Sequence, residues 1–209
     1  MIDQATLITY LVILFGFMLI PGPAVLLTLA RATTSGTRVG MATGLGVAIG
    51  DIIHTAMAVI GLSAIILASA FLFNLIKYIG AAYLVYLGIR AILERPDLNG
   101  IQGGMLSITP RQALRQAVLV EVLNPKSAMF FLAFLPQFVR LENGAVALQL
   151  SILGILFVAM GLLTTIVVAI CAGSVGRMLR RHPAILRWQG KFTGTIYCAL
   201  GIRLALQEK

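Results

Sequence analysis

The sequence predicts an all-α membrane protein whose six transmembrane helices form two inverted three-helix repeats, with the first and fourth helices broken. Three observations predict this fold: an apolar composition, six long apolar runs, and a similarity between the two halves of the chain. Of the 209 residues, 59% are hydrophobic and 11% are charged, whereas soluble domains average about 45–50% and about 25%. This composition excludes a soluble enzyme, a disordered segment and a secreted disulfide scaffold.

Six apolar runs are long enough to cross a membrane, because a helical span needs about 20 apolar residues. They lie near Leu7–Leu29, Met41–Ile66, Leu72–Ile92, Ala117–Val139, Val146–Ala172 and Trp188–Leu206. Few polar residues separate the second run from the third, so five spans are an alternative. The chain begins without a basic segment, and the first run is therefore expected to be a membrane helix and not a signal peptide.

The basic residues are distributed unevenly between the gaps that separate these runs. Of the 16 lysines and arginines, eleven lie in the odd-numbered gaps and three on the opposite side. By the positive-inside rule, this count places the odd-numbered loops in the cytoplasm and both termini on the opposite side of the membrane, which is the periplasmic side if the membrane is a bacterial inner membrane. The net charge of +9 is therefore expected to interact with the negatively charged face of a membrane and not with nucleic acid.

The two halves of the chain, about residues 1–95 and 110–209, resemble each other and are expected to form one transport domain. Lysine, an aromatic residue and glycine occur in Lys77–Gly80 and again 114 residues later in Lys191–Gly194. The sequence Leu-Gly-Ile-Arg occurs in Leu87–Arg90 and again 113 residues later in Leu200–Arg203. Because each half holds three spans, the two copies cross the membrane in opposite senses, as in many secondary transporters. Chance similarity between two apolar helices is the alternative.

Proline interrupts the first run at Pro21-Gly22-Pro23 and the fourth at Asn124-Pro125-Lys126. Proline removes a helix hydrogen bond, and backbone groups freed in hydrocarbon must face protein or a wet cavity. Pro23 is suited to the first position of a restarted half-helix, whose free N–H groups attract anions. We therefore predict a binding site between the two breaks, with a plain kink as the alternative at each.

Four ionisable residues lie within the runs or near their ends: Asp51, His54, Glu121 and Lys126. Such residues usually face the interior of the bundle and serve a function, because a charge at the bilayer centre costs about 2.5–3.5 kcal/mol. A carboxyl group removed from water keeps its proton more readily, which suits a proton carrier. The predicted proton-coupling residues are Asp51, Glu121 and His54, with a structural Glu121–Lys126 ion pair and a packed, hydrogen-bonded His54 as alternatives. The predicted substrate-binding residues are Pro21, Gly22, Pro23, Asp51, Glu121, Asn124, Pro125 and Lys126.

Glycines recur in and before the second run, at Gly36, Gly40, Gly44, Gly46 and Gly50. Small residues at this spacing let helices approach closely, so these positions predict close packing around the second helix.

The sequence contains no phosphate-binding loop, no zinc-ligand spacing and no nucleophile beside a base. No catalytic residue, cofactor or metal is therefore expected, and the protein is not predicted to be an enzyme. Cys171 and Cys198 lie in apolar runs, where they are expected to act as small hydrophobic residues.

These motifs resemble the lysine exporter (LysE) superfamily and, within it, the homoserine/threonine exporter (RhtB) branch. The matching segments are Ile20–Pro23, Gly36–Asp51, Lys77–Leu84, Leu123–Lys126 and Phe130–Phe138. The resemblance implies export of amino acids or close derivatives from the bacterial cytoplasm, driven by the proton gradient. Many members have Asn after Pro-Gly-Pro, where this chain has Ala24, a departure that bears on which substrate is recognised.

The resemblance and the two breaks together predict proton-coupled antiport, with an amino acid, protons and the lipid bilayer as partners. The substrate carboxylate is expected at a half-helix start beside Lys126, and the ammonium near Asp51 or Glu121 and near carbonyls freed at Pro21. A homo-oligomer is compatible with the sequence. The main alternative is an inorganic cation exporter of the same superfamily, using Asp51, His54, Glu121 and Cys171 as ligands. A membrane-embedded enzyme fits the duplicated, broken helices less well.

Overall fold

The structure is a computed structural model that describes residues 2–19, 22–64, 70–93 and 108–181, together with 188, 191, 194–195, 198–199, 201–202 and 205–206. Every regular element in these residues is a helix, which confirms the all-α class. Two described helices, Thr37–Leu62 and Val146–Ser174, are long and apolar enough to cross a membrane. The number rises to four if each of two bent helix pairs is one span.

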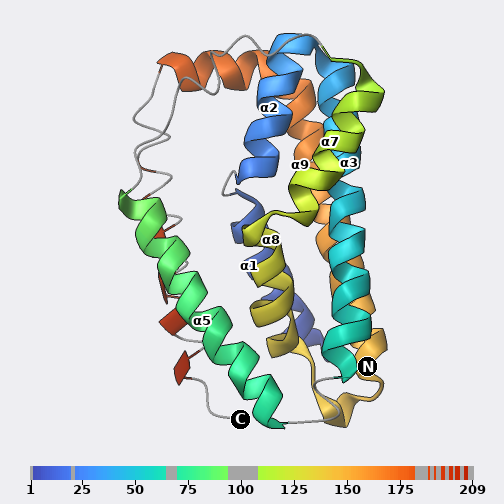
Figure 1. The fold of residues 1–209 in the computed structure, drawn as a ribbon, viewed down its shortest axis with the longest axis vertical. Coiled ribbons are helices and arrows are strands. Elements are labelled where there is room, and N and C mark those ends of the chain that lie inside the picture. Colours follow the sequence, from blue (N-terminus) through green and yellow to red (C-terminus); the bar gives the residue numbers. More distant parts are fainter. Residues whose placement is uncertain are drawn as a thin grey trace.

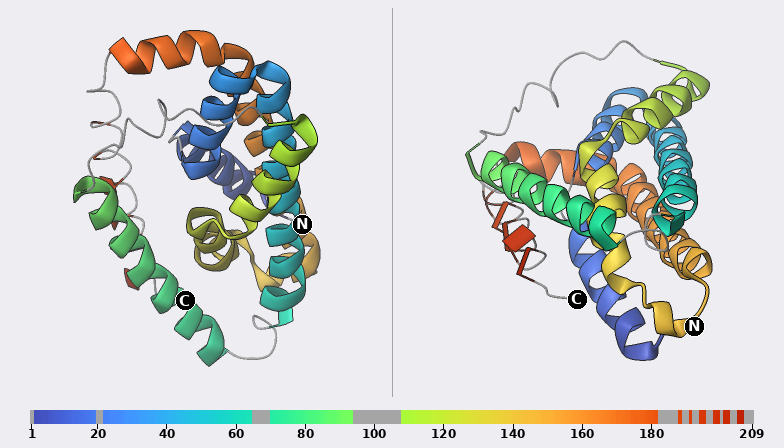
Figure 2. Two further views of the ribbon diagram at one scale, coloured as in Figure 1. Left: turned by 45° about the horizontal axis from the view of Figure 1, so that its top comes forward. Right: turned by 60° about the horizontal axis from the view of Figure 1, so that its bottom comes forward.

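Most of the helices form a bundle, and one long helix, α5 (Ala70–Leu93), lies at its side, where it packs against η2 (Phe130–Phe134) (Figure 1). In chain order they are α1 (Gln4–Leu19), α2 (Pro23–Ser35), α3 (Thr37–Met57), η1 (Ala58–Leu62), α5 (Ala70–Leu93), α7 (Pro110–Val122), α8 (Pro125–Met129), η2 (Phe130–Phe134), η3 (Leu135–Phe138), η4 (Leu141–Asn143) and α9 (Val146–Arg181). The bundle is centred on α3, which packs against α2, α7 and α9. Figure 2 shows from two further directions that α5 lies outside this bundle.

The bent pairs coincide with the predicted proline breaks. Helices α1 and α2 meet at an angle of 49°, and α7 meets the segment Pro125–Phe138 at 43°. Both second members begin with proline, Pro23 in α2 and Pro125 in α8. Proline at the first helical position loses no hydrogen bond, because the N–H groups of the first turn have no partner within the helix. The chain therefore restarts a helix at each break.

Helix α7 begins seven residues before the apolar run that predicted it, at Pro110 instead of Ala117. Thr109 and Gln112 explain this start, because they form a capping box: Gln112 N donates to Thr109 Oγ1 (3.3 Å) and Thr109 N donates to Gln112 Oε1 (3.0 Å). The added turns are polar, so apolar periodicity alone does not reveal them.

The glycines of α3 let its neighbours approach closely, as predicted. A Cβ atom on Gly40 would lie 2.5 Å from Ala32 Cβ of α2, and one on Gly46 would lie 2.3 Å from the carbonyl oxygen of Leu114 in α7. Neither contact is compatible with a larger side chain in place. Gly36, between α2 and α3, has a positive φ of 91°, which other residues rarely adopt.

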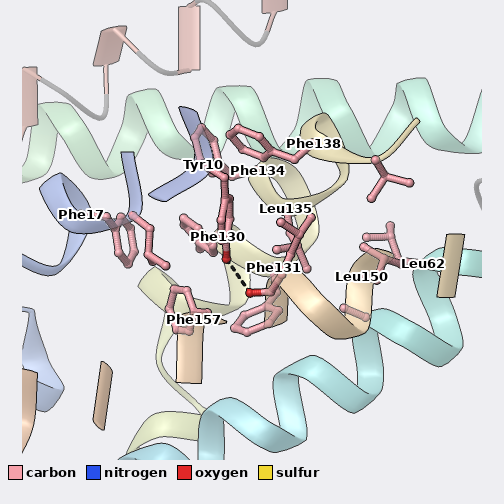
Figure 3. Close-up of a cluster of buried hydrophobic side chains, with 14 of the residues drawn as sticks. Tyr10, Phe17, Leu62, Phe130, Phe131, Phe134, Leu135, Phe138, Leu150 and Phe157 are labelled. Atoms are coloured by element: carbon pink, nitrogen blue, oxygen red, sulfur yellow. Dashed lines mark hydrogen bonds between the residues drawn. The ribbon is translucent and has the colours of Figure 1, made fainter. Parts of the chain in front are cut away.

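One end of the molecule is filled by an aromatic cluster, drawn in Figure 3. We use this name for the buried rings of Tyr10, Phe17, Phe130, Phe131, Phe134, Phe138 and Phe157. The rings come from α1, η2, η3 and α9, and they pack in tilted or edge-on pairs such as Phe17–Phe130, with centroids 4.7 Å apart. The Tyr10 hydroxyl donates to the Leu153 carbonyl (2.7 Å), so this buried polar group is satisfied.

The opposite end of the bundle holds the ends of α2 and α9 and the starts of α3 and α7, at the top of Figure 1. We call it the arginine-rich end, because Arg38, Arg111 and Arg115 are exposed there. The sequence assigns these residues to gaps on one side of the membrane, and the structure places them near the starts of α3 and α7. The ends of α2 and α9 and the starts of α3 and α7 thus lie on one side of the bundle.

Candidate functional site

The two helix breaks lie at the same half-open cavity. Its water-accessible volume is about 40 Å³, which is room for about three water molecules. Backbone and side chains from α1, α2, α3, α7, α8 and α9 line it. The polar side chains among them are those of Asp51, Glu121, Asn124, Lys126, Ser127, Thr164 and Thr165. The structure therefore brings residues beside both breaks to one cavity, and the binding of a substrate there stays a prediction.

Glu121 accepts several hydrogen bonds in the cavity, because the second break itself supplies the donors. Asn124 Nδ2 donates to both carboxylate oxygens (3.2 and 3.1 Å), and the Ser127 hydroxyl donates to Oε1. Asn124 also caps α8, since its Oδ1 accepts from the backbone N–H of Lys126 (3.0 Å). One residue thus starts the half-helix and fixes the carboxylate.

Asp51 faces Glu121 from α3. Its side chain is 2% exposed and lines the same cavity as the Glu121 carboxyl group. Two carboxyl groups can share a hydrogen bond only if one of them carries a proton. The second Asp51 oxygen, Oδ1, is buried without a hydrogen-bond partner among the described residues. The acid pair can therefore hold a proton and still offers a free acceptor to a ligand.

Lys126 reaches from the second break to the first. Its Nζ donates to the Phe17 carbonyl (3.4 Å) and lies 4.2 Å from the centroid of the Phe17 ring. The space for it comes from Gly22, where a Cβ atom would lie 2.9 Å from Lys126 Cδ. A cation at the last carbonyls of α1 is favourable. The sequence assigned freed carbonyls of this break to the substrate ammonium, whereas Lys126 occupies the one at Phe17.

His54 is buried beside the site but does not line the cavity. Its Nε2 donates to the backbone carbonyl of Glu121 (3.0 Å), and its ring stacks on Phe131 at a centroid distance of 5.6 Å. This is the packed, hydrogen-bonded arrangement that the sequence left as an alternative to a proton relay.

The prolines set the position of the cavity without lining it. Pro23 and Pro125 have exposed side chains and are absent from the lining. Their neighbours Gly22 and Asn124 do line it, and Pro21 lies outside the described residues. The physical reason is that a proline at a helix start fixes the backbone, while the adjoining residues face inward.

Several lining residues were not predicted from the sequence. Ser127 follows Asn124 by three residues, which is the spacing that places two side chains on one side of a first helical turn. This spacing could therefore have predicted Ser127 from the sequence. Phe17, Thr164 and Thr165 carried none, because they lie in apolar runs without a nearby charge.

No group of three or more His, Cys, Asp or Glu side chains within the described ranges is arranged to hold a metal ion. Cys171, which the cation-exporter alternative uses as a ligand, is exposed on α9 and does not line the cavity.

Comparisons with known proteins relate the chain to bacterial membrane proteins. An uncharacterized membrane protein of Vibrio cholerae is 32% identical over 198 residues, which cover 95% of each chain. The uncharacterized membrane protein YrhP of Bacillus subtilis is 30% identical over 96% of this chain and 99% of its own. A leucine efflux protein of Salmonella choleraesuis is 33% identical over 63% of this chain and 62% of its own. No solved structure shows a significant match. The family model of the LysE type translocators matches residues 14–208, and the chain therefore belongs to the LysE type translocator family.

Proposed function

We propose that this protein exports amino acids from the bacterial cytoplasm as a proton-coupled antiporter of the inner membrane. The observation that carries this proposal is a cavity between two helix breaks in which an acid pair, Asp51 and Glu121, lies beside the ammonium of Lys126. Membership of a translocator family and similarity to a leucine efflux protein support amino-acid export.

The polar groups of the cavity match those of a zwitterionic amino acid. The substrate ammonium is placed at Asp51 Oδ1, the buried acceptor without a partner, and the substrate carboxylate at Lys126. The volume of about 40 Å³ accommodates these polar groups but not a whole amino acid with a large side chain. Substrate binding therefore requires the surrounding helices to separate.

Proton coupling follows from competition for the acid pair. The proton shared by Asp51 and Glu121 and the substrate ammonium both neutralise the same two carboxyl groups. Binding of the ammonium expels the proton, and a proton arriving from the periplasm displaces the ammonium. Each release of substrate on the periplasmic side thus takes up a proton, which returns to the cytoplasm with the empty carrier.

Contacts between the third and sixth predicted spans support an inverted repeat. A Cβ atom on Gly88 would lie 2.6 Å from the carbonyl oxygen of Gly194, and one on Gly201 would lie 2.7 Å from that of Ala81. At the offsets of 113 and 114, Gly88 corresponds to Gly201, and Gly194 corresponds to Gly80, the neighbour of Ala81. A two-fold relation between the halves exchanges these two contacts to within one residue. Alternating access is then rocking of one repeat against the other.

The proposal is tested in proteoliposomes that are loaded with labelled amino acids, beginning with leucine, and placed in an acidic medium. We expect the imposed pH gradient to accelerate efflux through the wild-type protein. Asp51→Asn and Glu121→Gln should each lower this efflux at least about tenfold, equivalent to ~1.4 kcal/mol. Glu142→Gln, at an exposed acid in η4, is the matched control and should leave it unchanged. Intact proton-driven efflux in both cavity variants would contradict the coupling scheme.

A further inference from the structure

Arg31 is a buried cation in α2 whose acceptors are both neutral. Its side chain is 5% exposed. Nη1 donates to the Ala113 carbonyl (2.8 Å), and Nη2 donates to Gln116 Oε1 (2.6 Å), both in α7. Nε is buried without a partner among the described residues, and no acidic side chain in those residues forms an ion pair with Arg31. Burying a charge without an opposite charge costs free energy, so a structural tie alone explains this residue poorly.

The position of Arg31 connects it to the cavity along the α2–α7 interface. Buried residues of α2 run from Ala24, which lines the cavity, to Arg31, about 10 Å farther along the helix at 1.5 Å per residue. Buried residues of α7 run the opposite way from Ala113, the partner of Arg31, to Glu121 in the cavity. The two helices are antiparallel, so the interface has Arg31 at one end and the acid pair at the other.

The interface between these two ends is closed by small side chains. Ala24, Val47 and Ala117 form a buried cluster between α2, α3 and α7. The aromatic cluster at the other end of the bundle contains seven rings. A small separation of α2 from α7 therefore opens a path from the arginine-rich end, whereas a path through the rings needs a much larger rearrangement.

We propose that Arg31 is a second carboxylate-binding site, which receives the amino-acid carboxylate at the arginine-rich end before the substrate enters the cavity. The proposal rests on the proposed function, since it concerns the same substrate. A carboxylate accepts two parallel hydrogen bonds from a guanidinium and binds it more strongly than neutral carbonyl or amide oxygens do. The arriving carboxylate replaces Ala113 O and Gln116 Oε1 and so releases α2 from α7.

The test measures equilibrium binding of two labelled leucine analogues to the purified full-length protein. One is 4-methylpentanoate, which keeps the carboxylate and lacks the ammonium; the other is leucinamide, which keeps the ammonium and lacks the carboxylate. Arg31→Gln should weaken 4-methylpentanoate at least tenfold and change leucinamide less than twofold. Arg31→Lys should fall between Arg31→Gln and the wild type, because lysine keeps the charge and loses the planar fork. Arg38→Gln, at an exposed arginine of the same end, is the matched control and should change neither.

Gln116→Leu separates carboxylate binding from a structural tie without touching Arg31. Gln116 is exposed, and its removal takes away a competitor for the guanidinium. We expect 4-methylpentanoate to bind several-fold more tightly, whereas a purely structural role predicts equal or weaker binding of both analogues. The proposal is overturned if wild-type protein does not bind 4-methylpentanoate, if Arg31→Gln leaves its binding unchanged because Lys126 alone holds the carboxylate, or if Arg31→Gln weakens both analogues equally. Failure of wild-type proteoliposomes to export amino acids overturns the proposed function instead, and the two failures are thus distinguishable.

Discussion

The two helix breaks share a proline at the restarted helix and differ in almost everything else. At the first, α2 begins after Gly22, which has no side chain with which to cap the helix. At the second, α8 begins after Asn124, which caps the helix and holds Glu121. Gly22 at the first break leaves space in the cavity, and the side chain of Lys126 from the second break occupies that space. Two equivalent backbone interruptions can therefore have different roles: the first leaves space in the cavity, and the second provides its charged side chains.

Replacement of Asn124 should have the largest effect, because it removes the cap and the donors to a buried carboxylate together. We expect Asn124→Ala to lower the free energy of unfolding by about 2–4 kcal/mol, the sum of a cap and a hydrogen bond to a charged group. Chemical denaturation in detergent measures this change. Asn124→Asp keeps the cap acceptor and loses the donor to Glu121, so it should start α8 normally and lose export. Wild-type export by Asn124→Asp would show that the donation to Glu121 is dispensable.

The spacing between α3 and the second break depends on Gly50, where a Cβ atom would lie 2.5 Å from Glu121 Cβ. We expect Gly50→Ala to destabilise the protein by about 1–3 kcal/mol through overpacking, measured as a shift in the denaturation midpoint. Gly16→Ala in α1 is the matched control, because no atom lies within 4 Å of its added Cβ; it should be neutral or slightly stabilising. Equal effects at both glycines would contradict the close approach.

Gly22→Ala tests whether the first break contributes space. The added Cβ meets the flexible end of Lys126, so the fold should lose less than about 1 kcal/mol while export falls about tenfold. Lys126→Ala removes the clash, and the double variant should therefore lose less than the sum of the two single losses. Strict additivity in proteoliposome efflux would mean that the two breaks do not meet at this pair.

We expect the smallest effect at a third helix start, that of α1, which extends the comparison of helix starts to one outside the bilayer. Asp3 accepts from the Thr6 backbone N–H (2.9 Å) and hydroxyl (2.7 Å), and the backbone hydrogen bond is the main reason why the pKa of this exposed carboxyl group lies below its usual value of 3.8. A lowered pKa stabilises the folded state above pH 3.8, and the stabilisation is lost as the pH falls through the lowered pKa. The protection of the Thr6 amide, measured as its exchange rate relative to that of an unstructured peptide at the same pH, should therefore fall in acid. Asp3→Asn should remove this pH dependence, and its persistence would assign the effect to another group.

Much of the fold and part of the site could be predicted from the sequence, because some residues act locally. Proline at positions 23 and 125 interrupts any helix, and Gly46 permits close approach wherever α3 packs. The charged cavity residues Asp51, Glu121 and Lys126 were identifiable because a charge in an apolar run is costly unless it faces the interior. Helix starts in polar segments, such as Pro110, were placed too late because they leave no apolar signal.

By itself, the sequence determined that the chain is apolar and helical, that two helices restart at prolines, and which acids lie at the interior. Only the tertiary structure decided the pairings: Lys126 with the Phe17 carbonyl, Asp51 with Glu121, and Arg31 with α7. Helix propensity and hydrophobic patterning depend on neighbouring residues in the chain. A side chain's hydrogen-bond partner depends on how helices distant in sequence are placed in space.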